Sequence, residues 1–415
     1  MRSSANKFFF VFILFITAIN LVWGQNALQK GYWNGKLESH GGDLPFNFII
    51  EDASNPNSIQ IKIVNGSEEF FHGDSYIKND SLIIPFELYD SKIIAHIEGD
   101  QKIKGYWEKK RNGKILGTIP LTAQAGPRKR FEIPSTPAVK NISGKYQADF
   151  FREGDEKGSP GVGIFEQDGQ NIRGTFLKTS GDYRFLEGNI FGDSLVLSYF
   201  DGSSVYLFKS KISGDTIKGE FYSGFDGIRT FICEKNPMAS LPDSKLITQL
   251  KEGYSTLGFQ LPSPEGEIIS LKDSRFKNKV VVIELLGSWC PNCMDESKFL
   301  APFYDKHKDK GLEMLGLAFE YSTDMKVSGP KINRFKERNG IHYPVVLAGQ
   351  PSSESALAVL PELNSINGYP TTILIDKSGK VREIETGFSG PGTGIHYQDW
   401  IEKFEKTIME LLNEK

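Results

Sequence analysis

The sequence predicts a multidomain chain in which an all-β, antiparallel region is followed by an α/β domain. With 415 residues, the chain is too long for a single hydrophobic core. Residues 25–236 alternate short apolar runs with Gly, Asn, Asp and Ser, which is typical of strands joined by turns. After residue 254 apolar runs alternate with helical stretches, which indicates an α/β layer arrangement.

The composition is that of a soluble globular protein without the charge that nucleic-acid binding requires. Hydrophobic residues make up 39% of the chain and the formal net charge is −3. Because there is no basic excess to face a phosphate backbone, we expect no nucleic-acid partner. The six histidines form no close pair in the sequence. We therefore expect neither a bound metal nor another cofactor.

The first 24 residues have the pattern of an export signal. Arg2 and Lys7 supply positive charge, and residues 8–23 are almost wholly apolar. The small residues near Gly24 predict cleavage before Gln25, but the run is also nearly long enough for an uncleaved membrane anchor. We expect cleavage and a soluble protein in the periplasm or another extracytoplasmic compartment. Contact with the membrane is then expected only through this segment, if it stays attached.

The β-rich region contains an internal repeat with a spacing of about 113 residues. Asp80-Ser81-Leu82 returns as Asp193-Ser194-Leu195, and Ile103-Lys104-Gly105-Tyr106 returns as Ile217-Lys218-Gly219-Glu220. Two β units of similar build are therefore expected. Two sandwiches, two half-barrels and one larger closed sheet all fit the pattern.

Proline-bearing breaks divide the chain. The stretch 122–139 is rich in Pro, Lys and Arg and is interpreted as a linker, and a second break follows at 236–244. A short helix is expected over 245–252. The predicted units are a signal peptide at 1–24, β repeats at 25–128 and 140–236, a linker at 237–253 and the α/β domain at 254–415.

The elements of the α/β domain follow from the spacing of apolar residues. Residues 280–286 form an apolar run broken only by Glu284, which is typical of a buried parallel strand. A helix is expected from Pro291 to about Lys310, and a second buried strand over 312–319. The other predicted elements are helices at 332–339 and 400–413, strands at 343–347 and 372–376, and a hairpin strand at 381–385.

The candidate chemistry lies in the motif Trp289-Cys290-Pro291-Asn292-Cys293, between the buried strand and the helix. The first-turn amides of a helix are unpaired and its dipole is positive there, so a thiolate is stabilised at this point. Pro291 suits the first helical position. We expect Cys290 to be the exposed attacking sulfur. Cys293, one turn further on, would then resolve the mixed disulfide.

The C-x-x-C pair has two alternative uses, a structural metal site and a structural disulfide. A structural metal site needs two further ligands at suitable spacing, and the sequence has no second C-x-x-C. A purely structural disulfide remains open, because an extracytoplasmic compartment can be oxidising. The third cysteine, Cys233, follows an apolar stretch and is expected to be a buried, inert strand residue.

Residues 254–415 resemble the thioredoxin-fold thiol-disulfide oxidoreductases of the TlpA/ResA type. The segments that carry the resemblance are Phe259 to Leu271, Val280 to Cys293, Gly368-Tyr369-Pro370-Thr371-Thr372 and Thr386-Gly387-Phe388. The resemblance implies a thioredoxin fold, in which helices flank a central mixed sheet. It also implies a redox-active disulfide between Cys290 and Cys293 and an extracytoplasmic location.

The resemblance also implies roles for residues outside the cysteine pair. Glu284 lies where an acid beneath the second cysteine acts as general base for Cys293, with a solvent-exposed strand-end acid as the alternative. Glu296 is a candidate for tuning the cysteine pKa values, or is a solvated helix carboxylate. The expected substrate-binding residues are Trp289, Pro291, Tyr369, Pro370 and Thr371, with Pro370 in a cis peptide bond.

The expected function is an extracytoplasmic thiol-disulfide oxidoreductase, most simply a reductase of protein disulfides. Many members of the family have proline before the second cysteine, where this chain has Asn292, so the direction of the chemistry stays open. The resemblance suggests a membrane thiol-donor protein as electron source. A thiol peroxidase is an alternative, which Gly287 disfavours because a Thr is expected there. A partner-binding β protein with an accessory redox domain is another alternative.

Overall fold

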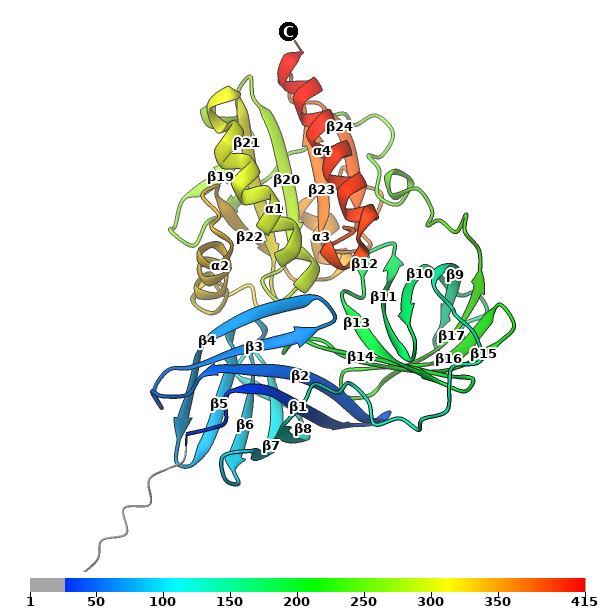
Figure 1. Ribbon diagram of the computed structural model, residues 1–415. Coiled ribbons are helices and arrows are strands. Elements are labelled where there is room, and N and C mark those ends of the chain that lie inside the picture. The colour runs from blue at the N-terminus through cyan, green and yellow to red at the C-terminus, as the bar shows by residue number, and fades with distance from the viewer. Residues whose placement is uncertain (1–26, 415) are drawn as a thin grey trace, which may run out of the picture.

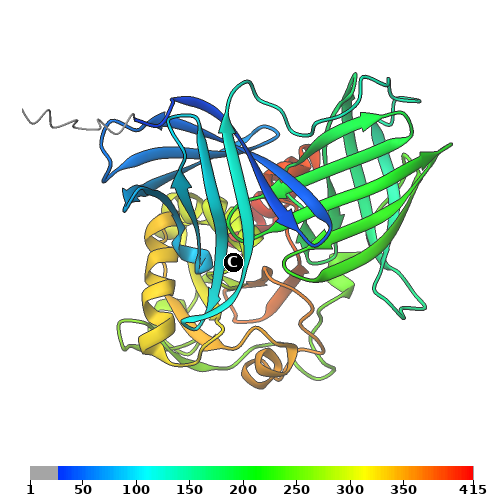
Figure 2. The same ribbon diagram turned by 90° about the horizontal axis from the view of Figure 1, so that it is seen from below.

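The computed structural model describes residues 27–414, so the predicted signal peptide at 1–24 lies outside the described residues. The described chain forms two β-barrels and one α/β domain, and the α/β domain lies against both barrels (Figure 1). Seen from below, the two barrels lie side by side (Figure 2). Among residues 27–414, none of the helices combines the length and the apolar character that a membrane crossing would need.

The first repeat forms a closed barrel, barrel 1, in which each strand pairs antiparallel with the next and β8 pairs with β1. Alternate side chains along β5 are buried, as the apolar alternation in the sequence predicts. Trp33 and Trp107 are buried at its centre. Its elements are β1 (Gly31–Ser39), β2 (Gly42–Asp52), β3 (Ile59–Asn65), β4 (Glu68–Lys78), β5 (Ser81–Phe86), η1 (Glu87–Tyr89), β6 (Ser91–Ile97), β7 (Lys102–Arg111) and β8 (Lys114–Ala125).

The second repeat forms its own barrel, barrel 2, which closes through an additional pairing of β10 with β11. Buried aromatic rings fill its interior, among them Phe176 and Phe208, whose centroids lie 5.2 Å apart. Its strands are β9 (Gly144–Phe151), β10 (Ser159–Asp168), β11 (Asn171–Lys178), β12 (Gly181–Asp182), β13 (Leu186–Phe191), β14 (Ser194–Phe200), β15 (Val205–Ser213), β16 (Thr216–Ser223) and β17 (Gly227–Lys235).

The internal repeat seen in the sequence corresponds to equivalent strands in the two barrels. Ser81 begins β5 and Ser194 begins β14. Gly105 in β7 and Gly219 in β16 occupy the same kind of place, because a Cβ at either would press into the backbone carbonyl of the neighbouring strand. None of the three arrangements that fitted the sequence pattern is formed, because each repeat closes into a barrel of its own.

The α/β domain is built on a five-stranded mixed sheet with strand order β22-β21-β20-β23-β24. The pairs β20–β21 and β21–β22 are parallel, and β23 runs antiparallel to both of its neighbours. The sheet strands are β20 (Val280–Leu286), β21 (Leu312–Phe319), β22 (Val345–Gly349), β23 (Thr371–Ile375) and β24 (Val381–Thr386). A small hairpin, β18 (Gln260–Pro262) with β19 (Ile268–Ser270), precedes them.

Helices cover both faces of this sheet, which confirms the predicted thioredoxin fold. The core on one face joins α1, α2 and α4 to the sheet, and the core on the other face includes residues of α3 and β19. Successive residues of β20 alternate between the two cores, so the whole strand is buried. The helices are α1 (Pro291–His307), α2 (Met325–Asn339), α3 (Ser353–Val359) and α4 (Ile395–Asn413), with short 3₁₀ turns η2 (Ser244–Leu246), η3 (Ser274–Phe276), η4 (Lys308–Lys310) and η5 (Pro391–Thr393).

Two expectations about the connections were wrong. The helix expected over 245–252 is only the 3₁₀ turn η2, capped by Asp243 through a bond from the Lys245 N–H. The linker expected from 122 begins later, because β8 continues to Ala125 where it pairs with β1. In both places pairing with a distant segment decides the local structure, because Leu250 bridges to Leu363 and β8 pairs with β1.

Candidate active site

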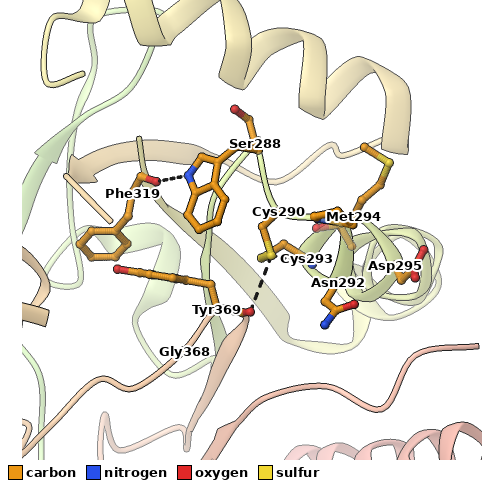
Figure 3. Close-up of a disulfide and its surroundings, with 12 residues drawn as sticks. Ser288, Cys290, Asn292, Cys293, Met294, Asp295, Phe319, Gly368 and Tyr369 are labelled. Atoms are coloured by element: carbon orange, nitrogen blue, oxygen red, sulfur yellow. Dashed lines mark hydrogen bonds between the residues drawn. A yellow bond between two sulfur atoms is a disulfide. The ribbon is translucent and has the colours of Figure 1, made fainter. Parts of the chain in front are cut away.

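The two cysteines of the C-x-x-C motif form a disulfide at the start of α1 (Figure 3). Cys290 is the N-cap residue with an extended backbone, and its sulfur accepts the Cys293 N–H at 3.2 Å. Pro291 occupies the first turn, where no N–H partner is needed. The sulfur of Cys290 is therefore positioned at the positive end of a 17-residue helix, which favours a thiolate there.

The turn from β20 to α1 is held from its outer side by β21. The Glu320 carboxylate, just after β21, accepts the Ser288 N–H at 2.7 Å and its hydroxyl at 2.9 Å. The Trp289 indole N–H donates to the Phe319 carbonyl at 2.9 Å (Figure 3). Burial raises the pKa of Glu320 to about 7. These bonds fix the direction in which the chain enters the cysteine motif.

The proline loop faces the disulfide from β23. The Tyr369-Pro370 peptide bond is cis, as the resemblance predicts. The Tyr369 carbonyl oxygen lies 3.6 Å from the Cys290 sulfur (Figure 3). Thr371 is fully buried, and its hydroxyl donates to the Gly368 carbonyl at 2.9 Å. The side chain of Thr371 therefore stabilises the loop, and the surface beside the disulfide is formed by Tyr369.

Glu284 is a buried acid behind α1, fully enclosed within β20. Its carboxylate accepts the Ser297 hydroxyl at 2.7 Å and the Tyr343 hydroxyl at 3.0 Å. Ser297 stands one helical turn after Cys293, so the acid lies against the inner side of the active-site helix. Burial raises the pKa of Glu284 to about 7, although both hydroxyl bonds act against this rise. Glu284 is therefore not a solvent-exposed acid at the end of a strand, which was the alternative prediction.

Glu296 is a second buried acid on α1, only 1% exposed. It accepts the Thr372 hydroxyl at 2.8 Å, and its other carboxylate oxygen is buried with no hydrogen-bond partner among the described residues. Burial raises the pKa of Glu296 well above its usual value, and the charge of Glu284 raises it further. A buried carboxyl with an unpaired oxygen is best accommodated as the neutral acid. Glu296 is therefore not a solvated helix carboxylate, which was the alternative prediction.

The expectation that Cys290 is exposed was wrong for the oxidised protein. Cys290 is 5% exposed, because it belongs to a buried cluster that includes Leu88 of barrel 1. Trp289 and Tyr369 pack on the same cluster and lie edge to face with ring centroids 6.0 Å apart. Cys293 is fully buried. Access to the disulfide is consequently controlled by aromatic rings and by the barrels.

Barrel 2 contributes a buried arginine to this site that the sequence did not reveal. Arg184 forms an ion pair with Asp295 of α1 and another with Glu68 of barrel 1 at 2.7 Å. It also donates to the Pro291 carbonyl at 3.1 Å and to the Tyr199 hydroxyl at 2.6 Å. One guanidinium thus joins both barrels to the first turns of the active-site helix. No local motif marks Arg184, because its partners in the other two domains, Asp295 and Glu68, are more than 100 residues away in sequence.

Barrel 1 reaches the site through η1. Leu88 packs in the core of the α/β domain together with Cys290 and Cys293, and the Tyr89 hydroxyl lies 3.8 Å from the Met294 sulfur. Cys233 is remote from this chemistry. It is fully buried in β17, and burial raises the pKa of its thiol.

The fold and the site define the class of protein. A C-x-x-C disulfide at a helix N-terminus, a facing cis-proline loop and a thioredoxin fold together make this chain a thiol-disulfide oxidoreductase. Residues 240–395 match the Redoxin family, which leaves both barrels outside the match.

Curated relatives give the family more narrowly. The thiol-disulfide oxidoreductase ResA of Geobacillus thermodenitrificans (strain NG80-2) is 32% identical over 142 residues, which are 34% of this chain and 72% of that protein. ResA of Bacillus subtilis (strain 168) is 30% identical over 138 residues, or 33% and 69% of the two chains. Through its C-terminal domain this chain belongs to the ResA family of thiol-disulfide oxidoreductases.

Among solved structures, a putative thiol:disulfide interchange protein DsbE from Chlorobium tepidum is 23% identical, with a TM-score of 0.31. The match covers 40% of this chain and 100% of that chain.

Proposed function

We propose that this protein is an extracytoplasmic disulfide reductase that acts on protein disulfides through Cys290 and Cys293. The observation that carries the proposal is the placement of the disulfide, with Cys290 at the N-terminus of α1 and two buried acids, Glu284 and Glu296, beside the same helix. An isolated structural disulfide requires no such acids. Trp289, Pro291, Tyr369 and Pro370 are proposed to contact the substrate.

In the proposed reaction the reduced protein attacks first through Cys290. Its thiolate displaces one sulfur of the substrate disulfide, which leaves as a thiolate and takes up a proton. Cys293 then loses its proton to Glu284, and its thiolate attacks the Cys290 sulfur. The second substrate sulfur leaves, and the Cys290–Cys293 disulfide forms. Two electrons pass from the cysteine pair to the substrate.

Glu284 is suited to the second step. With a pKa raised to about 7, its carboxylate is partly ionised at neutral pH and can accept a proton without being a permanently charged buried group. Glu296 is proposed to tune this step as a neutral acid, because burial and the charge of Glu284 both raise the pKa of Glu296. Return of the protein to its reduced state requires two electrons, for which we propose a membrane thiol-donor protein.

The remaining parts of the proposal concern organisation. Residues 1–24 are proposed to be a signal peptide that delivers the chain to the periplasm or an equivalent compartment. The β repeats at 25–128 and 140–236 and the α/β domain at 254–415, with a linker at 237–253, are proposed as its domains. No cofactor is invoked, since the disulfide itself carries the electrons.

The direct test replaces Cys290 with Ser in the mature protein. Turnover of a fluorogenic peptide disulfide, with dithiothreitol as electron source, should fall to the background rate because the attacking thiolate is gone. Cys233→Ala is the matched control and should keep wild-type turnover, since Cys233 is buried in barrel 2. Undiminished turnover in Cys290→Ser would refute the assignment.

The direction of the chemistry is tested by the reduction potential of the cysteine pair, measured by equilibration with glutathione and mass tagging of free thiols. A value near the thioredoxin range of about −270 mV supports a reductase. A value toward about −120 mV would identify an oxidant and remove the reductase part of the proposal.

A further inference from the structure

A pocket beside the disulfide is walled by barrel 2 on one side and by the α/β domain on the other. Its volume is about 620 Å³, within the usual range of ligand sites. Trp289, Asn292 and Tyr369 line it, and Trp289 and Asn292 directly precede Cys290 and Cys293 in the sequence. The Asn292 side chain donates to the Asp182 carbonyl at 3.3 Å, which joins the two walls. Any substrate that approaches the disulfide from this side meets barrel 2.

The wall from barrel 2 carries three cationic side chains: Arg152, Lys178 and Arg229. They come from one end of barrel 2, where β9 and β17 are neighbours and β10 lies between β9 and β11. Lys178 ends β11, Arg152 follows β9, and Arg229 lies in β17 next to Thr230, which pairs with Phe151. Burial lowers the pKa of Lys178 to about 8, with a smaller lowering from the charge of Arg229 against the opposing charge of Asp149.

These cations form no ion pair with a described acidic side chain, although the charge of Asp149 acts on Lys178 and favours its protonated form. Among the ion pairs of the described side chains none involves Arg152, Lys178 or Arg229. Lys178 donates to the carbonyls of Ser159 and Pro160, at 2.9 and 2.7 Å.

Within residues 27–414, the contacts found for the Arg229 side chain are with neutral groups. It hydrogen-bonds Tyr183 and lies over the Phe221 ring, with 5.9 Å between the guanidinium carbon and the ring centroid.

Two carboxylates also line the pocket, but backbone N–H groups already bind them. Asp182 accepts the Gly390 N–H at 2.7 Å and the Arg184 N–H at 2.6 Å. Asp155 accepts the Arg152 N–H at 2.8 Å. Neither forms an ion pair with the three cationic side chains, so the pocket keeps guanidinium groups available for an external anion.

We propose that this pocket binds a carboxylate of the substrate, so that the preferred substrates are disulfides with an acidic side chain near the reacting cysteine. The inference rests on the proposed function and names its substrate class. Guanidinium groups suit carboxylates because they can donate two parallel hydrogen bonds. The half-buried rings of Tyr183 and Tyr206 in the same wall accommodate the carbon atoms of the bound segment.

The test uses three otherwise identical peptide disulfides with Glu, Gln or Lys beside the cysteine, and oxidised glutathione as a small carboxylate-bearing disulfide. The wild-type kcat/KM for the Glu peptide should exceed that for the Gln peptide about tenfold, the effect of one charge-assisted contact. In Arg229→Gln this ratio should fall toward one. Arg173→Gln is the matched control, since Arg173 is an exposed cation on β11 outside the pocket.

Charge reversal keeps the test independent of general damage to the protein. In Arg229→Glu the order should invert, with the Lys peptide turned over faster than the Glu peptide. If oxidised glutathione rather than the Glu peptide shows the larger loss in Arg229→Gln, the carboxylate source is a small thiol compound. Either result supports the site.

Two results would overturn the inference. One is equal turnover of the Glu, Gln and Lys peptides by the wild-type protein. The other is an equal loss of preference in Arg173→Gln and Arg229→Gln, which would mean that only bulk charge matters. Failure of the proposed function gives a different result, because then none of the disulfides is turned over at all.

Discussion

Barrel 1 and barrel 2 come from the same repeated sequence, but they meet the α/β domain through different parts of the repeat. In barrel 1 the contact is η1, between β5 and β6, which places Leu88 in the core around the cysteines. The corresponding loop of barrel 2, between β14 and β15, instead folds on itself. Asp201 there accepts the N–H groups of Ser203 and Ser204 at 2.8 and 2.6 Å.

The larger difference between the two barrels lies in the strand that precedes β5 in barrel 1 and β14 in barrel 2. Shifted by the repeat spacing of about 113 residues, β4 of barrel 1 corresponds to β12 and β13 of barrel 2. In barrel 2 this strand is interrupted at Arg184, which has a φ of 58°. The interruption directs Arg184 toward α1 and forms the turn that walls the pocket. The comparison teaches that a break in one repeated strand can convert a barrel wall into part of an active site.

The largest effect on stability is expected when the contact between barrel 2 and α1 is broken. Arg184→Met removes the partner of the buried Asp295 and Glu68 carboxylates, so the free energy of unfolding should fall by about 3–5 kcal/mol. Urea denaturation of the oxidised protein measures it. Arg173→Met, which breaks only the exposed pair with Glu166, should cost no more than about 1 kcal/mol. Equal losses in the two variants would contradict a structural role for Arg184.

A smaller effect on stability is expected when the contact between barrel 1 and the α/β domain is weakened. Leu88→Ala leaves a cavity in the core around Cys290, and unfolding should become easier by about 2–4 kcal/mol. Leu116→Ala is the control on the same barrel, because Leu116 is 45% exposed and its loss should change stability by less than about 0.5 kcal/mol. If Leu88→Ala behaved like its control, the contact through η1 would be incidental.

The smallest effect on stability is expected from Glu284, which lies inside the α/β domain and away from both barrels. Below pH 4.5, the ordinary pKa that applies to the unfolded chain, Glu284 is neutral in the folded and in the unfolded protein. Between pH 4.5 and about 7 it is ionised in the unfolded protein only. Its stabilising contribution is therefore lost as the pH rises through about 7. The oxidised protein should be more stable at pH 5 than at pH 8, and Glu284→Gln should reduce this difference by about 1–2 kcal/mol.

Thermal unfolding over this pH range provides the measurement, with the exposed Glu166→Gln as control. Glu320, whose pKa is also raised to about 7, leaves a residual slope of the same sign in the Glu284→Gln variant. An unchanged slope in that variant would show that Glu284 is not held neutral by burial. Leu88→Ala should keep the slope, since the described residues of barrel 1 supply no hydrogen bond to Glu284.

The sequence by itself determined the features that depend on neighbours along the chain. The alternation of apolar residues predicted the strands, the uninterrupted run at 280–286 predicted a buried strand, and the C-x-x-C pair after it placed Cys290 at a helix start. The repeat likewise predicted two related β units. Such signals are local, because periodicity and capping are properties of a short segment.

Only the tertiary structure decided how the barrels close, how exposed Cys290 is, and which residues surround it. Arg184 and Asp295 are 111 residues apart, and nothing in either segment marks the other as its partner. The same holds for Lys178, Arg152 and Arg229, which three strands of barrel 2 bring to one pocket. Contacts of this kind depend on the packing of whole domains, and the free energy that selects them is shared among many distant residues.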